Sequence, residues 1–318
     1  ALAALCATAQ GEGGGPEDGR RHTDNVLRWF GDLQALSPSW YLADLYIQWV
    51  DGVPLRLRYP YDLSFLSGYG AVFCAFDDQD SGNLCFGVRK GCDRYFIKFA
   101  GAPTQRYAGT PQDAIERLKA AVPVYRALTH PNLICLVKAE EIGGGYAAVF
   151  EWADGECPGR QYPLSHSRFF ILPLVERIGV YEDILAFHAY VAQCGYVAVD
   201  FYDGSILYDH ARKKTFICDI DFYTRQPYVN RMGRLWGSSR FMSPEEFTLG
   251  ATIDEVTNVY GMGATAFALL AQSDRSPDAW PLGKALYAVV SKAVSADRAQ
   301  RQRTIRQLIE EWEAAKQP

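Results

Sequence analysis

Two aspartates follow apolar stretches of this chain and flank a short polar loop. An apolar run, residues 196–199, leads into Asp200, and small and polar residues come after it. A second hydrophobic stretch ends at Asp219. Phosphoryl transfer to a hydroxyl group needs one carboxylate that orients the attacking hydroxyl and another that holds Mg²⁺ against the nucleotide phosphates. The context and spacing of Asp200 and Asp219 suit these two roles.

A single lysine interrupts residues 95–100, an otherwise apolar stretch that is predicted to be a β-strand. Burying the ammonium group of Lys98 costs free energy unless an anion meets it. We therefore expect an anionic group next to Lys98 in the folded protein.

Length and composition describe a chain with a large core and no basic surface. The 318 residues, 48% of them hydrophobic, suffice for two lobes or domains. The net charge of −5 does not favour binding to nucleic acid or to an anionic membrane. No apolar run reaches the roughly 18 residues that a membrane-spanning helix needs. The eight cysteines include no C-x-x-C pair, which predicts buried free thiols in a reducing, cytoplasmic environment.

The first sixty residues differ from the rest. Residues 1–23 begin with an Ala-rich stretch that lacks the basic start and the apolar length of a secretory signal, and continue with many glycines. We expect a flexible leader there. Residues 24–60 are dense in Leu, Trp and Tyr and are predicted to pack on the domain that follows. Binding of a protein partner through this extension is an alternative interpretation.

Around Asp200 the sequence resembles the protein kinases of eukaryotic type, including the serine/threonine kinases of this type from bacteria. Asp200 matches the aspartate of the family's H-R-D motif, Ser205 its catalytic-loop Asn, and Asp219 the aspartate of D-F-G. The resemblance implies an α+β, bilobal protein kinase-like fold. Residues 61–150 would form a small β-rich N-lobe with one main helix, and residues 151–318 a large, mainly helical C-lobe.

Motifs of the expected small lobe follow in the family's order. Ser67, Gly68, Gly70 and Val72 resemble the end of the glycine-rich loop, although the first two glycines of that pattern are replaced by Phe65 and Ser67. The resemblance therefore implies that these four residues approach a nucleotide.

Lys98 matches the lysine of the family's V-A-I-K strand, which pairs with a glutamate of the next helix. Two ways of counting give different candidates for this partner. The distance from Lys98 favours Glu116, whereas counting back from the H-P-N-like turn at residues 130–132 reaches Ala121. We expect Glu116, because Pro123 suggests an extra segment before the turn.

Residues 147–156 resemble the hinge between the lobes, where the Glu151 and Ala153 backbones would contact adenine. Residues 176–194 have apolar spacings of three and four and are predicted to be a long helix. Residues 237–245 resemble the end of the activation segment. Glu245 should pair with Arg301 of a D-P-x-x-R-x-x-T-like motif.

Four departures from the family pattern affect the expected chemistry. Val199 replaces the arginine of H-R-D, which leaves no cation beside Asp200 to bind a phosphorylated loop. Ser205 replaces the metal-binding Asn, and a hydroxyl is a weaker Mg²⁺ ligand. Asp221 replaces the glycine of D-F-G and adds a carboxylate. Tyr202 replaces a lysine of serine/threonine kinases.

The resemblance gives Lys98, Asp200 and Asp219 catalytic roles, with ATP and Mg²⁺ as cofactors. Asp219, Ser205 and Asp221 are the candidate metal ligands. The expected function is transfer of the γ-phosphate to a serine or threonine hydroxyl of a protein. Two alternatives remain open. One is the same chemistry on a small molecule or antibiotic, because residues 200–205 also resemble the D-x-x-P-G-N loop of aminoglycoside phosphotransferases. The other is a pseudokinase that binds a nucleotide or a partner.

Overall fold

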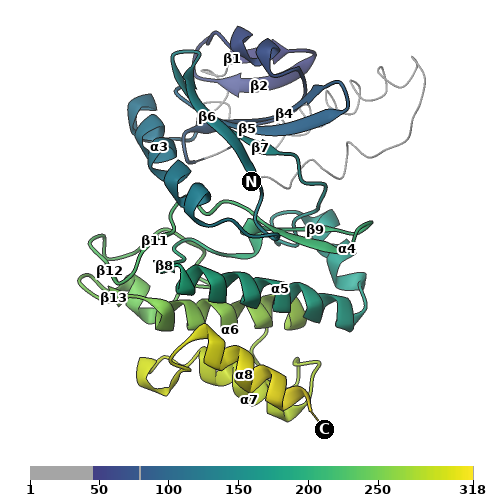
Figure 1. The fold of residues 1–318 in the computed structure, drawn as a ribbon, viewed down its shortest axis with the longest axis vertical. Helices are drawn as coiled ribbons and strands as arrows, with labels where there is room; N and C mark the ends of the chain where they lie inside the picture. The colour runs from purple at the N-terminus through teal and green to yellow at the C-terminus, as the bar shows by residue number, and fades with distance from the viewer. Residues whose placement is uncertain (1–45, 79, 318) are drawn as a thin grey trace, which may run out of the picture.

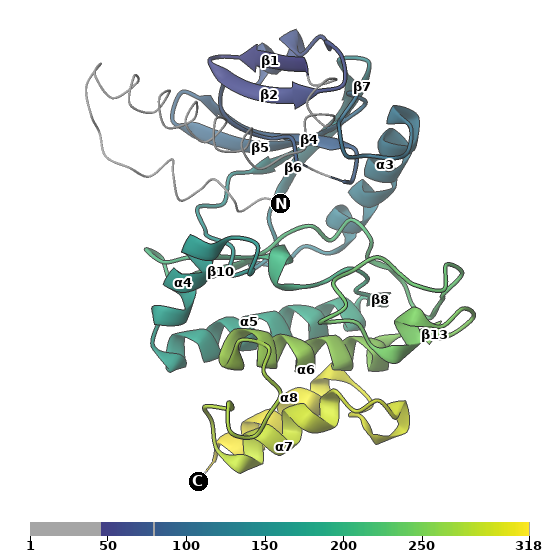
Figure 2. The ribbon, with the colours of Figure 1, turned by 180° about the vertical axis from the view of Figure 1, so that it is seen from behind.

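The computed structural model describes residues 46–78 and 80–317 and has a mixed α+β architecture (Figure 1). The predicted leader, residues 1–23, and the first part of the predicted extension, residues 24–45, lie outside the described residues. Figures 1 and 2 show a β-rich part stacked above a mainly helical part, with the C-terminus at the end remote from the sheet.

A five-stranded antiparallel sheet forms the centre of the β-rich part. Its strand order is β3-β4-β5-β7-β6, with the following bounds: β3 Ala71–Phe76, β4 Asn83–Lys90, β5 Asp93–Ala100, β6 Leu136–Ile142 and β7 Gly145–Glu151. The register places Lys98 of β5 opposite Cys85 of β4 and Ala148 of β7. The predicted strand over residues 95–100 is confirmed by β5.

A hairpin and a short helical turn cover one face of this sheet. β1 (Tyr46–Val50) pairs with β2 (Val53–Leu57), and the 3₁₀ turn η2 spans Ser64–Gly68. Leu57 from the hairpin is buried in one apolar cluster with Phe99 from the sheet. Successive side chains of a strand point to opposite faces, so Phe99 and Lys98 lie on opposite sides of β5.

Helix α3 (Pro111–Ala127) packs beside the opposite face of the sheet (Figures 1 and 2). Thr110 caps its N-terminus by accepting a hydrogen bond from the Asp113 amide, and Pro111 occupies the first turn, where a missing N–H costs nothing. The helix continues through Pro123 to Ala127. The expectation that Pro123 marks a separate segment is therefore wrong.

The helical part is built from five α-helices. Their bounds are α4 Pro163–Ile171, α5 Leu174–Gln193, α6 Glu255–Ala271, α7 Lys284–Ala293 and α8 Ile305–Lys316. Helices α5 and α6 lie side by side, and α7 and α8 pack beneath them (Figures 1 and 2). The predicted long helix over residues 176–194 is confirmed by α5. None of the helices in the described residues could span a membrane.

Short strand pairs lie between the two parts and hold the loops that carry the aspartates. The pairs are β8 (Tyr196–Val197) with β11 (Thr224–Arg225), β9 (Ile206–Asp209) with β10 (Lys214–Ile217), and β12 (Tyr228–Val229) with β13 (Thr252–Ile253). The 3₁₀ turns η3 (Asp203–Ser205), η4 (Pro244–Phe247) and η5 (Arg298–Gln300) complete the connections.

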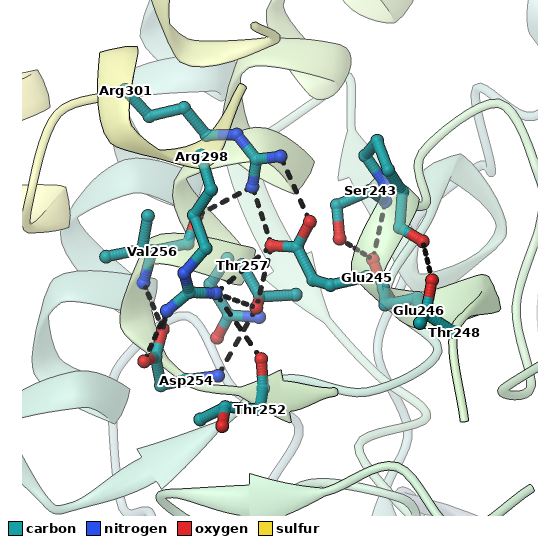
Figure 3. Close-up of polar contacts among 12 residues, drawn as sticks. Ser243, Glu245, Glu246, Thr248, Thr252, Asp254, Val256, Thr257, Arg298 and Arg301 are labelled. Atoms are coloured by element: carbon teal, nitrogen blue, oxygen red, sulfur yellow. Dashed lines mark hydrogen bonds and ion pairs between the residues drawn. The ribbon is translucent and has the colours of Figure 1, made fainter. Parts of the chain in front are cut away.

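A buried ion pair joins η4 to the segment before α8 (Figure 3). Arg301 donates from Nη1 to Oε1 of Glu245 at 2.6 Å and from Nη2 to Oε2 at 3.0 Å, and its side chain is fully buried. Arg298 adds a contact to Glu245 at 3.2 Å. Burial alone would raise the pKa of Glu245, but the hydrogen bonds from Arg301 outweigh it and hold this pKa below its ordinary value. The predicted Glu245–Arg301 pair is confirmed.

Arg301→Ala should lower the free energy of unfolding by about 3–5 kcal/mol, because it leaves the Glu245 carboxylate buried without its main partner. Glu245 has a lowered pKa, so the stability from this pair is present above the ordinary glutamate pKa and is lost as the pH falls through the lowered value. Denaturant unfolding at about pH 7 and about pH 4 should therefore show a smaller difference between variant and wild type in acid. Lys292→Ala removes an exposed ion pair with Glu311 and should cost about 1 kcal/mol or less. Equal losses in the two variants would contradict the prediction.

Candidate functional site

Asp200 and Asp219 lie in the loops that follow two short strands, β8 and β10. Both have left-handed backbones, with φ of 64° and 59°. A non-glycine residue in this region is uncommon and is held there by its surroundings. The two side chains are close enough for the charge of Asp219 to raise the pKa of Asp200.

Asn258 of α6 fixes the backbone two residues before Asp200. Its Oδ1 accepts a hydrogen bond from the Ala198 amide, and its Nδ2 donates to the Ala198 carbonyl, both at 2.7 Å. Asn258 is buried, so these bonds are shielded from water. This residue holds the loop that carries Asp200.

Lys98 is buried and meets two carboxylates. Its Nζ lies 2.8 Å from Oδ1 of Asp219 and 2.8 Å from Oδ2 of Asp221. Burial would lower the pKa of Lys98, but Asp219 and Asp221 hold it well above its ordinary value. The expected anionic group next to Lys98 is thus a pair of aspartates from the segment after β10.

The predicted pairing of Lys98 with Glu116 is wrong. Glu116 is exposed on α3 and accepts a hydrogen bond from Gln112, one turn earlier. Because α3 runs without interruption through Pro123, counting back from residue 130 gives the better position, and that position is the fully buried Ala121. Of the two candidate positions, the first has a glutamate that is exposed, and the second has an alanine that is buried. Neither position therefore places a glutamate next to Lys98.

Tyr125, one turn after Ala121, supplies the polar contact from α3. Its hydroxyl donates to Oδ1 of Asp221 at 2.8 Å and accepts from the Ile220 amide at 3.1 Å. Its ring packs edge-on against Phe150, with centroids 4.8 Å apart. The sequence analysis does not single out Tyr125, because a tyrosine on an apolar helix face is usually a residue of the hydrophobic core. The i, i+4 spacing from Ala121 was the available signal.

The predicted glycine-rich loop is also misplaced. Ser67 and Gly68 belong to η2, before the first strand of the sheet, and Val72 is buried in the apolar cluster on the face opposite to Lys98. Gly70 is required for a different reason. With φ of 134° it passes so close to the Arg89 carbonyl that an added Cβ would lie 2.2 Å from that oxygen. These four residues thus do not border Lys98.

An acidic connection between β3 and β4 lies nearer to the candidate catalytic residues. The structure describes residues 77–78 and 80–82 of it. Asp77 is bound by Arg56, with Nη2 to Oδ1 at 2.7 Å, and Asp78 by Arg106 at 2.6 Å. Asp80 is close enough to raise the pKa of Asp200.

Burial is the main cause that raises the pKa of Asp200 to about 7, followed by the charges of Asp219, Asp80, Asp221 and Glu246. Glu246 is buried too, and burial raises its pKa to about 7. Both residues line a cavity of about 20 Å³, large enough for one water molecule. A carboxyl group with a pKa near neutrality can accept a proton and release it again.

The hinge-like residues Glu151 and Ala153 lie at and just after the end of β7. The Glu151 amide donates to the Cys135 carbonyl at 2.9 Å. Trp152 lies between them, and Phe73 packs edge-on against its ring at 4.9 Å. A role for Glu151 and Ala153 in nucleotide binding stays a prediction.

Ser205 is buried at the end of η3, and its carbonyl accepts a hydrogen bond from the amide of Cys218, which precedes Asp219. Its Oγ has no hydrogen-bond partner among the described residues. The Asp219 side chain remains 35% exposed. No group of three or more His, Cys, Asp and Glu side chains in residues 46–78 and 80–317 is arranged to hold a metal.

Val199 belongs to a small apolar cluster beneath the segment that follows Asp219. The cluster contains Val197, Val199, Leu235, Met242 and Ile253, with Phe222 and Tyr228 packed against it. Trp236 is half exposed and lies beside Phe222, with ring centroids 6.2 Å apart. Arg225 stacks on Tyr196 and donates to the Cys194 carbonyl, while Arg234 donates to the Gly237 carbonyl. Val199 stands where the kinase pattern has an arginine, and its apolar packing thus holds this segment.

No model of a known protein family matches this chain, and no curated protein matches it.

The segment over residues 222–242 should be ordered without phosphorylation, because Val199 and Leu235 hold it by apolar packing. Limited proteolysis should cut this segment at the same rate before and after phosphatase treatment. Val199→Ala should accelerate cleavage, since it removes buried methyl groups. Val175→Ala, at a position that is 71% exposed, is the control. Faster cleavage of the wild-type segment after dephosphorylation would refute this prediction.

Proposed function

We propose that this protein is a protein kinase-like phosphotransferase that uses ATP and Mg²⁺ and transfers the γ-phosphate to a serine or threonine hydroxyl of a protein. The observation that carries the proposal is the convergence of Lys98, Asp219 and Asp200. Lys98 comes from the sheet, and the two aspartates come from loops on the helical part. These are the charged groups that phosphoryl transfer requires.

The arrangement of elements supports a bilobal protein kinase-like fold. Lys98 lies on β5, the third strand of the five-stranded sheet in chain order, and α3 follows it. In protein kinases the nucleotide-binding lysine is on the third strand, and the following helix contributes to its position. The long helix α5 leads into the loop that carries Asp200, as the family pattern requires.

The residues present fit a Mg-nucleotide. Mg²⁺ keeps several water molecules and is held by one or two carboxylates together with substrate phosphates, so a dedicated cluster of protein ligands is not needed. Asp219 is partly exposed and would be the main ligand. Ser205 is the second candidate, because its carbonyl is hydrogen-bonded to the amide of Cys218, the residue before Asp219, and its Oγ has no hydrogen-bond partner among the described residues. The bound metal supplies charge neutralisation on the phosphates.

Asp200 is the group suited to orient an acceptor hydroxyl. Its carboxyl makes the loop after β8 acidic, and its raised pKa of about 7 favours proton acceptance near neutral pH. The ammonium of Lys98 would attract phosphate oxygens.

The segment that ends at Glu245 supports a protein substrate over a small molecule. Small-molecule kinases normally lack the stretch that resembles residues 237–245. In this chain Arg301 and Arg298 anchor its end at Glu245. A small-molecule or antibiotic hydroxyl remains the alternative acceptor, to be tested with an aminoglycoside panel beside a generic peptide.

A second candidate is a pseudokinase that binds a nucleotide or a partner without phosphoryl transfer. It is favoured by the acidic connection between β3 and β4, since Asp80 lies near Asp200 where a glycine-rich loop would otherwise receive phosphates. Lys98 is also engaged by two carboxylates. Turnover measurements separate the two candidates.

Asp200→Asn should reduce turnover of ATP with Mg²⁺ or Mn²⁺ by a factor of about 10² or more, with nearly unchanged ATP affinity, because the substitution removes the group that orients the hydroxyl. Initial rates with a peptide mixture measure the effect. Asp278→Asn makes the same chemical change at an exposed position and should be neutral. Full activity of Asp200→Asn would eliminate its assigned role, and absence of turnover in the wild type would favour the pseudokinase.

Asp219→Asn should abolish Mg²⁺-dependent nucleotide binding, because it removes the carboxylate matched to the metal. Lys98→Ala should weaken binding or turnover through loss of the phosphate contact. Thermal stabilisation by Mg-ATP, compared with ATP plus EDTA, reports binding without requiring catalysis. Stabilisation that survives Asp219→Asn would count against the metal role.

A further inference from the structure

We propose that Asp221 is the positioning residue for Lys98 and that Tyr125 couples it to α3, in place of a glutamate on that helix. This inference rests on the proposed function, in which Lys98 contacts nucleotide phosphates. In the resembled family, an ion pair between this lysine and a helical glutamate must be in place for activity. Here the carboxylate comes instead from the segment after β10.

Both oxygens of Asp221 are engaged by buried partners. Oδ2 contacts Nζ of Lys98 at 2.8 Å, and Oδ1 accepts from the Tyr125 hydroxyl at 2.8 Å. The Tyr125 hydroxyl in turn accepts from the Ile220 amide at 3.1 Å. The Asp221 side chain is only 15% exposed, and hydrogen bonds to a charged group are strong when shielded from water. Its orientation is therefore fixed from two sides.

Helix α3 has no carboxylate that could position Lys98. Its acidic residues are Asp113, which caps the helix, and Glu116, which bonds to Gln112 on the exposed side. The buried face has Ala121 and Tyr125 one turn apart. The Tyr125–Asp221–Lys98 chain of contacts is thus the polar link between α3 and Lys98.

The two carboxylates on Lys98 differ in a way that assigns them different roles. Asp219 is 35% exposed, and among the described residues its carboxylate pairs with Lys98 alone, so it can turn to a metal. Asp221 is less exposed and is held by Tyr125 as well. When Asp219 ligates the metal of an incoming nucleotide, Asp221 keeps Lys98 in place and charged.

Binding of the fluorescent nucleotide mant-ATP with Mg²⁺ and ATP turnover test this assignment. Asp221→Asn should weaken mant-ATP binding and raise the KM for ATP by about tenfold or more, because Lys98 loses a charged hydrogen-bond partner. Tyr125→Phe should shift both in the same direction by a smaller factor. Asp278→Asn and Tyr59→Phe make the same chemical changes at exposed positions and should match the wild type.

A double-mutant cycle in denaturant unfolding gives a readout that does not depend on nucleotide. Lys98→Met and Asp221→Asn should be non-additive, so that the double variant loses less stability than the sum of the single variants. Additive losses, or wild-type KM and binding in a folded Asp221→Asn, would overturn the assignment. Failure of the proposed function looks different: the wild type itself would neither bind mant-ATP nor turn over ATP, while the non-additive cycle would still be observed.

Discussion

A buried ammonium group cannot remain without an anion, and in this protein that requirement joins the two parts of the molecule. Lys98 is carried by the central sheet, whereas Asp219 and Asp221 belong to the segment that leaves β10. The ion pairs therefore fix how that segment lies against β5. Removing water from such a pair is costly, and good geometry with extra hydrogen bonds is what compensates. The Tyr125 hydroxyl provides one of these bonds.

The helical part supplies the rigid frame on which the loops rest. Asn258 of α6 holds the Ala198 backbone, and the Glu245–Arg301 pair fastens the end of the following segment to the residues before α8. Asp200 lies between these two attachments with a left-handed backbone. Because such a backbone costs free energy, it persists only where neighbouring bonds hold it. The strain at Asp200 is thus maintained by contacts that do not take part in chemistry.

Much of this arrangement could be predicted from sequence, and the errors have physical reasons. Strands around Lys98 and helix α5 follow from local patterns of apolar residues. The Glu245–Arg301 pair was predictable because both residues stand in recognisable motifs. The Glu116 assignment failed because Pro123 was read as a break, whereas helix α3 tolerates it. The glycine assignment failed because Gly70 meets a steric need against Arg89 rather than a ligand. The spacing of Tyr125 from Ala121 could have placed it on the buried face of α3, but its contact with Asp221 could not be predicted, because only the fold brings the two residues together.

The balance of charge around Lys98 determines how a nucleotide and its metal would bind in the proposed function. The carboxyl groups of Asp80, Asp219 and Asp221 all act on Asp200, and one lysine lies among them. Such an excess of negative charge repels a bare triphosphate and attracts a divalent cation. A nucleotide that arrives with its metal carries less charge and brings the cation that these carboxylates lack. In the proposed function, this acidity would weigh against binding of a nucleotide without metal and would make binding strictly dependent on Mg²⁺.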